Sequence, residues 1–279
     1  MEVDEDSIYS YYVEKGGEIF KEKLTDHVKE ALSTVSCSKQ SKISQYIEKI
    51  LGSIDIRFAE AVRLSIIFHD IGKIFYQKNY KYDKIHNNIR YLSFTGHEFL
   101  SSYIFDKFAF RLASSETLSK TLSACNFSIL FHHHAMNPKY RASPYREPIT
   151  VGKAAVDDVK IERLKILNQF LKSSEVEPWR AAINDVEVEV KKSKDVNAFI
   201  GSVVSSMFSP QGLGKKIWRI FISDSIFRKT SLALLSTLLV ADYFSALKLR
   251  PESKPSTFHN VLREFYSYYL SNTFTEPKK

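Results

Sequence analysis

Histidine and aspartate side chains occur in this sequence where an apolar helix would bury them. The segment LSIIFHDIGKIFYQ ends an apolar run with His69 and Asp70, and Gly72 and Lys73 follow. Imidazole nitrogens and carboxylate oxygens are common ligands of divalent metals. Gly72 permits a tight turn beside Lys73, whose ammonium group would then lie close to an anion bound at the metals. The pattern indicates a buried metal site next to a cation.

Three consecutive histidines in SILFHHHAMNP are the second candidate for metal binding. Purely structural reasons for three adjacent imidazoles are few, which favours a ligand role. Adjacent side chains on a helix point about 100° apart, so all three cannot face one ion equally. His132 and His133 are the preferred pair, and His134 is the alternative.

Three further residues complete the set. His27, in LTDHVKEAL, shares an apolar helical face, where a core histidine bonded to a carbonyl is the alternative. Thr95 and Glu98 have the spacing of a capping box, so His97, which lies between them, is expected in the first turn of a helix. A surface histidine at a helix cap is the alternative. Asp242 lies on an apolar helical face, where a carboxylate must be coordinated or, alternatively, paired with a buried arginine. Together the candidate ligands for two divalent ions are His27, His69, Asp70, His97, His132, His133 and Asp242.

The order of these motifs resembles the HD superfamily of metal-dependent phosphohydrolases. The chain looks most like the stand-alone HD nuclease of type I CRISPR interference, the double-prime form found apart from its helicase. The resemblance rests on LTDHVKEAL, FHDIGKIFYQ, FTGHEFLSS, FHHHAM and LLVADYFSA, which span Leu24 to Ala246. It implies a metal-binding role for the seven residues above and a place for Lys73 near the scissile phosphate. It also implies a separate helicase subunit and a surveillance complex as partners. The family has a histidine pair where this chain has three histidines.

A site of this kind is expected to hydrolyse a phosphodiester, with two divalent ions bridged by Asp70. The ions and Lys73 would neutralise charge on the phosphoryl oxygens, so Asp70 and Lys73 are the predicted catalytic residues. Histidine-rich coordination favours Mn, Fe, Co or Ni, and Mg is compatible because phosphate and carboxylates can complete its shell. The alternatives are a phosphohydrolase of small nucleotides and a degenerate domain that only binds nucleic acid or a signalling partner.

Two segments rich in lysine, arginine and tyrosine directly follow proposed ligands, at 75–92 and after the histidine triplet. Cations contact backbone phosphates and aromatic rings stack on unpaired bases, so a nucleic-acid partner is expected. Single-stranded DNA is preferred, with RNA as an alternative. Solvated loops whose aromatic rings pack locally are the other interpretation. The predicted nucleic-acid-binding residues are Lys78, Lys81, Lys84, Arg90, Lys139 and Arg141.

Hydrophobic spacing predicts a mainly α-helical protein. Helices are expected at 18–35, 41–51, 56–69, 96–112, 115–133, 156–171, 178–190, 196–208, 230–247 and 257–270. The stretches 79–91 and 137–150 are predicted loops. The segment DVEVEVKKS could form one small β-hairpin or a charged helix end. SPQGLGKK lacks two residues of a phosphate-binding P-loop and is interpreted as a basic surface turn.

The chain has 279 residues, and one domain over 1–279 is expected, with 151–229 as a helical insertion or docking region. Its net charge of +8 suits a polyanionic partner but does not by itself require one. Two cysteines, Cys37 and Cys125, exclude a disulfide framework and a CxxC zinc site. No signal-peptide pattern is present, and Asp242 interrupts the longest apolar run, so a cytoplasmic protein without membrane contact is expected.

Overall fold

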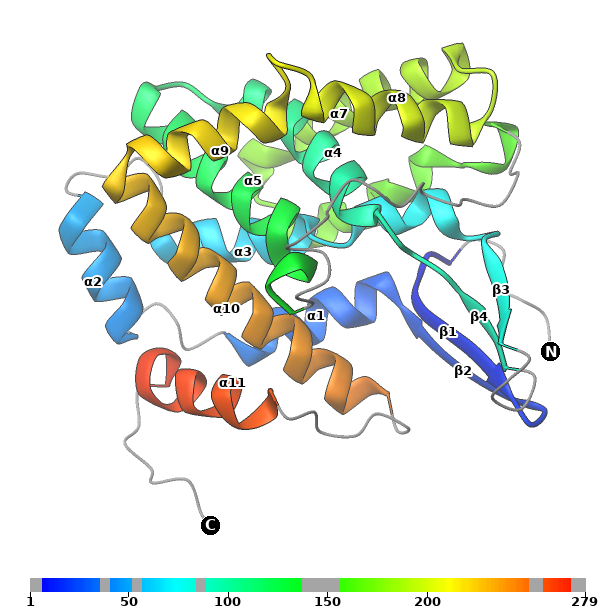
Figure 1. Ribbon diagram of the computed structural model, residues 1–279, viewed down its shortest axis with the longest axis horizontal. Coiled ribbons are helices and arrows are strands. Elements are labelled where there is room, and N and C mark those ends of the chain that lie inside the picture. Colours follow the sequence, from blue (N-terminus) through cyan, green and yellow to red (C-terminus); the bar gives the residue numbers. More distant parts are fainter. Residues whose placement is uncertain are drawn as a thin grey trace.

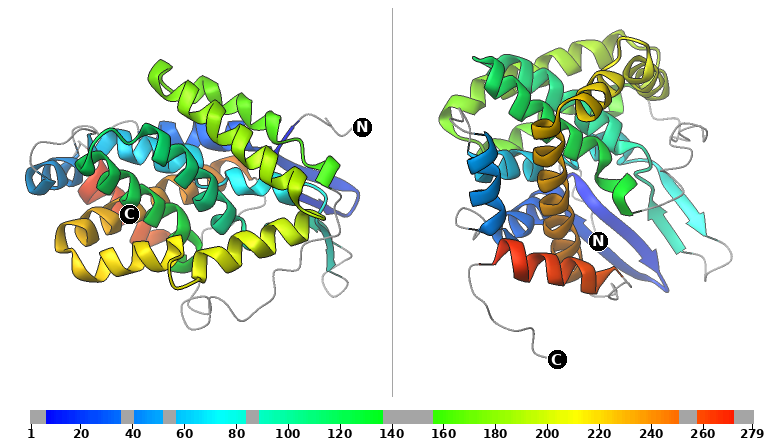
Figure 2. Two further views of the ribbon diagram at one scale, coloured as in Figure 1. Left: turned by 90° about the horizontal axis from the view of Figure 1, so that it is seen from above. Right: turned by 60° about the vertical axis from the view of Figure 1, so that its left-hand side comes forward.

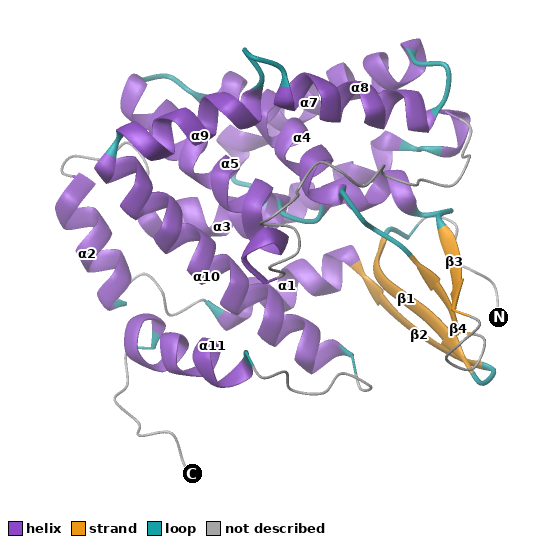
Figure 3. Cartoon of the chain, viewed as in Figure 1, coloured by secondary structure: helices purple, strands orange, loops and turns teal. Residues whose placement is uncertain are grey.

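The computed structural model describes residues 7–35, 41–51, 57–83, 89–136, 156–250 and 258–271. In these ranges helices form the body of the molecule, and a small antiparallel sheet extends from it (Figures 1 and 3). The expected mainly α-helical class is therefore confirmed. The helices are α1 (Leu24–Thr34), α2 (Lys42–Leu51), α3 (Phe58–Phe68), η2 (Ile71–Tyr76), α4 (His97–Leu112), α5 (Glu116–Met136), η3 (Val156–Asp158), η4 (Ile161–Phe170), α7 (Ser173–Lys192), α8 (Val196–Phe208), α9 (Leu213–Ser223), α10 (Ser225–Leu249), α11 (His259–Phe265) and η5 (Tyr266–Leu270). The strands are β1 (Tyr9–Lys15), β2 (Glu18–Lys23), β3 (Tyr80–Asp83) and β4 (Ile89–Leu92).

Helix α10 is a central element of the core and packs against α5, α1 and α3. Leu234, Leu238 and Ala241 recur at helical spacing on its buried face. Among the described helices it alone is long and apolar enough to cross a membrane, and half of its most apolar window is buried inside the fold. Such burial is typical of a core helix, and Asp242 on the same helix is mostly buried, with 15% of its side chain exposed.

The end of α3 is fixed by an aromatic cluster directly before His69. Phe68 is fully buried, and its ring stacks on Phe108 with a centroid distance of 4.7 Å. Trp179 meets Phe68 edge-on at 5.1 Å. These contacts join α3, α4 and α7 by burying large apolar rings. Packing in the core therefore fixes the positions of His69 and Asp70, which directly follow α3.

Helix η2 approaches the start of α4 so closely that only glycine fits at position 72. A Cβ atom there would lie 2.2 Å from the His97 carbonyl oxygen and 2.8 Å from the Ser101 amide nitrogen. The Gly72 amide also donates a hydrogen bond to Ser101 Oγ at 2.9 Å. The sequence favoured a tight turn as the reason for this glycine, whereas the structure uses it for close packing of two helices.

The sheet has the strand order β2-β1-β4-β3, and each pair of neighbours is antiparallel. β1 and β2 form a hairpin whose turn residues, Gly16 and Gly17, have φ of 60° and 84°. Two-residue hairpin turns of this kind need positive φ at both positions, which glycine adopts without strain. Figure 2 shows the strands extending from the helical body, with the β1–β2 hairpin leading directly into α1.

Of the two structures expected for DVEVEVKKS, the charged helix end is confirmed and the β-hairpin is not found. Residues 185–192 belong to α7, because Val186 and Val190 are one helical turn apart and buried while Val188 is exposed. Two other expectations about strands are wrong. Residues 18–23 form β2 rather than the start of a helix, and β3 and β4 occupy a stretch expected to be a loop. Strands this short carry a weak periodic signal, and their partners come from distant sequence.

Some helical expectations are also corrected. Residues 161–170 form the 3₁₀ helix η4, and α9 begins within the segment interpreted as a basic surface turn. Thr95 and Glu98 make no capping box, since α4 begins after Gly96 in the left-handed conformation (φ 88°) without a side-chain cap. His97 does lie in the first turn of α4. The predicted loop at 137–150 lies outside the described residues.

Candidate metal centre

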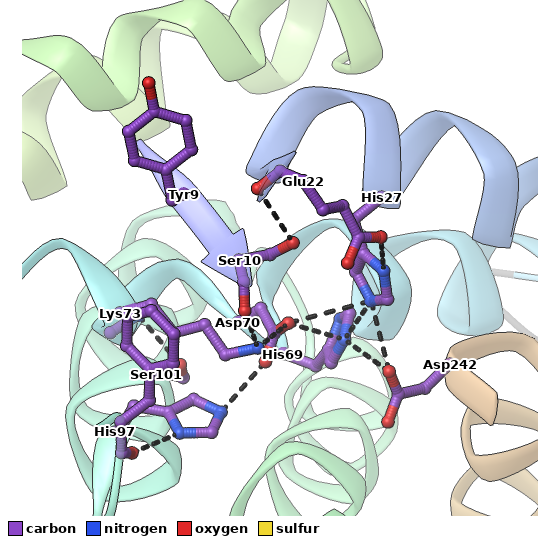
Figure 4. Close-up of polar contacts among 12 residues, drawn as sticks. Tyr9, Ser10, Glu22, His27, His69, Asp70, Lys73, His97, Ser101 and Asp242 are labelled. Carbon is purple, nitrogen blue, oxygen red and sulfur yellow. Dashed lines mark hydrogen bonds and ion pairs between the residues drawn. The ribbon is translucent and has the colours of Figure 1, made fainter. Parts of the chain in front are cut away.

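Side chains from separate helices converge in the interior beside the sheet (Figure 4). His27 comes from α1, His97 from the start of α4 and Asp242 from α10. His69 and Asp70 occupy the junction between α3 and η2. His132 and His133 come from near the end of α5, and the side chain of His134 lies outside the described part of the chain.

The first group of candidate ligands combines His27, His69, Asp70 and Asp242, with one ligand atom of each within 4.8 Å of the others. His27 Nε2 lies 3.3 Å from His69 Nε2 and 3.1 Å from Asp242 Oδ1. Asp70 Oδ2 lies 3.4 Å from His69 Nε2 and 3.6 Å from His27 Nε2. Two imidazoles and two carboxylates therefore face one small volume.

The second group combines Asp70, His97, His132 and His133 within the same 4.8 Å limit. Its contact to Asp70 uses the other carboxylate oxygen, since Oδ1 lies 2.8 Å from His97 Nε2 and 3.9 Å from His132 Nε2. His133 Nε2 lies 3.2 Å from His97 Nε2. Asp70 thus presents one oxygen to each group, which is the arrangement of a carboxylate shared by two ions.

The tautomers of three histidines fit metal binding. The Nδ1–H groups of His69, His97 and His132 donate to the carbonyl oxygens of Ile66, Phe94 and Ile129 at 2.8, 2.6 and 2.6 Å. A carbonyl can only accept, so Nδ1 carries a proton in each ring, which leaves Nε2 as the nitrogen that can bind an ion. Among the described residues, His132 Nε2 is buried without a hydrogen-bond partner. A buried acceptor without a partner is costly, and a divalent ion would satisfy it.

Glu22, which the sequence analysis did not select, orients His27. The His27 Nδ1–H group donates to Glu22 Oε1 at 2.7 Å, and Arg250 Nε donates to Glu22 Oε2 at 2.7 Å. A carboxylate behind a histidine ligand fixes the ring and makes its other nitrogen more basic. Glu22 lies on β2, so a correct prediction of that strand from the sequence would have pointed to this residue.

Electrostatic interactions separate the protonation states of the cluster. Burial alone would raise the pKa of Asp70, but His69, Lys73 and His97 hold that pKa well below its usual range. Burial alone lowers the pKa of His27, yet its hydrogen bonds with Asp242 and Glu22 raise it to about 9. Burial, together with His69 and His97, lowers the pKa of His132 to about 3. Without an ion, His27 therefore holds a proton among carboxylates, and a metal cation would take over that positive charge.

Lys73 lies against the shared carboxylate. Its ammonium group donates to Asp70 Oδ2 at 2.6 Å and to the Ser10 carbonyl oxygen at 3.1 Å, and it lies 5.2 Å from the centre of the Phe94 ring. Asp70 and Lys73, the predicted catalytic pair, are thus in direct contact. A cavity of about 320 Å³ opens onto this region, lined by Ser10, Tyr11, Lys73, Phe94, Thr95, Gly96, His97, Glu98, His133 and Arg250.

The predicted nucleic-acid-binding residues are more dispersed. Lys78 pairs with Asp158 at 2.6 Å on the surface. Arg90 lies over the Tyr80 ring and pairs with Glu14, whereas Lys81 stands opposite Tyr91 in the ladder and so on the other face of the sheet. Lys84, Lys139 and Arg141 lie outside the described residues.

Comparison with known proteins adds one finding. The family model described as HD domain matches residues 41–160. This segment holds His69, Asp70, His97 and the histidine triplet, while His27 and Asp242 come from outside it. No curated protein and no solved structure matches the chain. The segment 41–160 is thus similar to an HD domain, and both groups of candidate ligands include residues from it.

Proposed function

We propose that this protein is a metal-dependent nuclease that hydrolyses phosphodiester bonds, with single-stranded DNA as the preferred substrate. The observation that carries the proposal is the pair of four-residue groups that share Asp70, next to the ammonium group of Lys73. These two groups would hold two divalent ions side by side, and such a pair would supply the charge stabilisation that displacement at phosphorus requires.

When bound, divalent ions would supply Lewis acidity and a nucleophile from water at neutral pH. The chain's own residues would do the rest. Asp70 stays ionised and offers an oxygen to each group, and the backbone carbonyls hold three histidine rings with Nε2 inward. Lys73 contributes a cation on the same side as the cavity, where it can offset negative charge on a phosphate. Buried groups of this kind are preorganised, so little reorganisation accompanies the reaction.

A polymeric substrate is favoured by the open cavity at the site and by the net charge of +8. A phosphohydrolase of small nucleotides would be expected to enclose its ligand on most sides. The excess of cations instead suits the phosphate backbone of a nucleic acid.

We further propose that the protein acts in the cytoplasm in CRISPR antiviral defence, with a separate helicase subunit and a surveillance complex. This part rests on the order of the five motifs between Leu24 and Ala246. A nuclease for single strands requires a partner that exposes a strand when the target is a duplex.

The test is cleavage of an end-labelled single-stranded oligonucleotide by purified protein with Mn²⁺. We expect cleavage that is abolished by EDTA and lowered at least 10³-fold in Asp70→Asn, because removing a shared anionic ligand disrupts both ion sites. Asp185→Asn, at an exposed surface pair with Arg111, is the matched control and should retain activity. Cleavage that persists in Asp70→Asn, or hydrolysis of free nucleotides with none of oligonucleotides, would contradict the proposal.

A further inference from the structure

One face of the four-stranded sheet leads directly into the metal centre. Residues directly opposite each other on neighbouring strands share a face. The ladder pairs Tyr11 with Glu22, and Glu22 holds His27, so this row of the sheet is part of the site. Two residues further along each strand, on the same face, Val13 stands opposite both Phe20 and Tyr91.

This second row crosses all four strands. Tyr91 is in turn opposite Lys81 of β3, so the row reads Phe20, Val13, Tyr91, Lys81 from one edge of the sheet to the other. It therefore places an aromatic ring on either side of a small apolar residue, with a cation at one end. We name Phe20, Val13 and Tyr91 the aromatic platform.

An open groove of about 760 Å³ lies along the platform. Tyr11 and Phe94 line both this groove and the cavity at the metal centre, so the two spaces adjoin at these two residues. Phe20 and Tyr91 are partly exposed, and in the described part of the chain no aromatic ring stacks on either of them. On the opposite face Tyr12 packs edge-on against Tyr80 and Arg90 covers Tyr80, while Tyr82, nearer the end of β3, is exposed.

We propose that the aromatic platform binds the bases of a single-stranded nucleic acid whose backbone continues to the metal centre. Aromatic rings on a sheet stack on unpaired bases whatever their sequence. Phe20 and Tyr91 are two strand spacings apart, roughly 10 Å, so one base cannot stack on both. The platform and the metal centre together need at least three consecutive nucleotides. This inference rests on the proposed nuclease function and adds the surface that would hold the bases of an oligonucleotide substrate.

The charges around the platform limit the path that a bound nucleic-acid strand can take. The next row toward the β1–β2 turn pairs Lys15 with Glu18, and Asp83 lines the same end of the groove. Two carboxylates outweigh the single lysine there and disfavour phosphates, whereas Arg250 and Lys73 lie at the metal-centre end, each paired with a carboxylate, and bound ions would add positive charge beside them. The nucleic-acid strand would therefore run from the platform toward the metal centre rather than along the β1–β2 hairpin.

Binding of a fluorescein-labelled oligo-dT to the full chain, followed by fluorescence anisotropy with EDTA present, tests the inference without cleavage. We expect Phe20→Leu and Tyr91→Leu each to weaken binding by about fivefold or more, as loss of one stacked base does. Tyr91→Phe keeps the ring and should retain binding. Tyr82→Leu, 65% exposed on the opposite face, is the matched control and should bind like the parent. A duplex of the same length should compete poorly, because its base faces are not accessible.

The proposed role of the platform is wrong if the parent, both leucine variants and Tyr82→Leu bind the oligonucleotide equally. It is also wrong if the parent binds no single-stranded oligonucleotide. Far-ultraviolet circular dichroism and a thermal unfolding curve identify a variant that has lost its fold, in which case Tyr91→Phe and Tyr91→Leu decide the question. Hydrolysis of bis(p-nitrophenyl) phosphate by the parent with Mn²⁺ separates the two proposals. If the parent hydrolyses this small diester while the platform variants bind normally, only the platform is wrong. If the parent cleaves neither the diester nor an oligonucleotide, the nuclease function itself is wrong.

Discussion

At the scale of single residues, the site depends on groups that orient ligands as well as on the ligands. The backbone carbonyls of Ile66, Phe94 and Ile129 select the tautomers of three histidines. His27 differs, because a carboxylate rather than a carbonyl receives its Nδ1–H. Glu22 is itself held by Arg250, which makes this the one histidine whose orientation, among the described contacts, depends on a charged pair.

Glu22→Gln should weaken metal binding by about 10- to 100-fold, the usual effect of removing a carboxylate behind a histidine ligand. The amide keeps the size of the side chain but loses the charge that makes His27 more basic. Isothermal titration of metal-free protein with Mn²⁺ measures the effect. Glu18→Gln, an exposed residue of the same strand, is the control, and equal affinities for the two variants would contradict the role of Glu22.

At the scale of elements, the metal centre is assembled by the contacts between helices. The aromatic cluster around Phe68 fixes the end of α3, and Gly72 lets η2 lie against the start of α4. The first contact positions His69 and Asp70, and the second brings His97 to within 2.8 Å of Asp70. Helix α9 and the 3₁₀ helices between α5 and α7 carry none of the candidate ligands, and the role of residues 151–229 as an insertion or docking region stays a prediction.

Gly72→Ala should destabilise the fold by about 1–3 kcal/mol, because a methyl group has to be inserted into a closely packed contact. The new Cβ would meet backbone atoms of α4, which cannot move away as a flexible side chain can. Urea denaturation followed by circular dichroism measures the change. Gly201→Ala is the control, since position 201 is exposed on helix α8 and its Cβ would meet nothing within 4 Å, so the change should be neutral or stabilising by up to about 1 kcal/mol. A Gly72→Ala protein as stable as the parent would show that η2 and α4 adjust freely.

At the scale of the whole molecule, the two candidate ion sites connect segments that are far apart in sequence. The first group alone joins α1, the α3–η2 junction and α10. Carboxylates and imidazoles gathered in the interior cost free energy unless an opposite charge is present. Bound ions would thus stabilise the folded chain as well as enable its chemistry.

Saturating Mn²⁺ should raise the unfolding free energy by about 2.7 kcal/mol when the free ion is at 100 times its dissociation constant. The rise follows from binding to the folded state alone, and EDTA should reverse it. Differential scanning fluorimetry over a Mn²⁺ titration measures it as a concentration-dependent increase in Tm. Asp70→Asn should show a much smaller increase, and an equal one would place the stabilising ion elsewhere.

The sequence by itself was sufficient for the helical class, because long amphipathic and apolar segments such as that of α10 carry a strong periodic signal. It also pointed to the residues that converge, since histidines and aspartates on apolar faces have few structural explanations. It missed the sheet, and with it Glu22 and the aromatic platform. Strands of four to seven residues depend on partners elsewhere in the chain, so their pairing has no local signature.

Only the tertiary structure decided which atoms meet. The division of the ligands into two groups, the sharing of Asp70 between them and the role of Gly72 as a close contact are all properties of helix packing. The same holds for Lys81 and Arg90, neighbours in the expected binding segment that the ladder places on opposite faces. Residue type limits what chemistry a side chain can do, but distance and direction arise from contacts between segments that are remote in sequence.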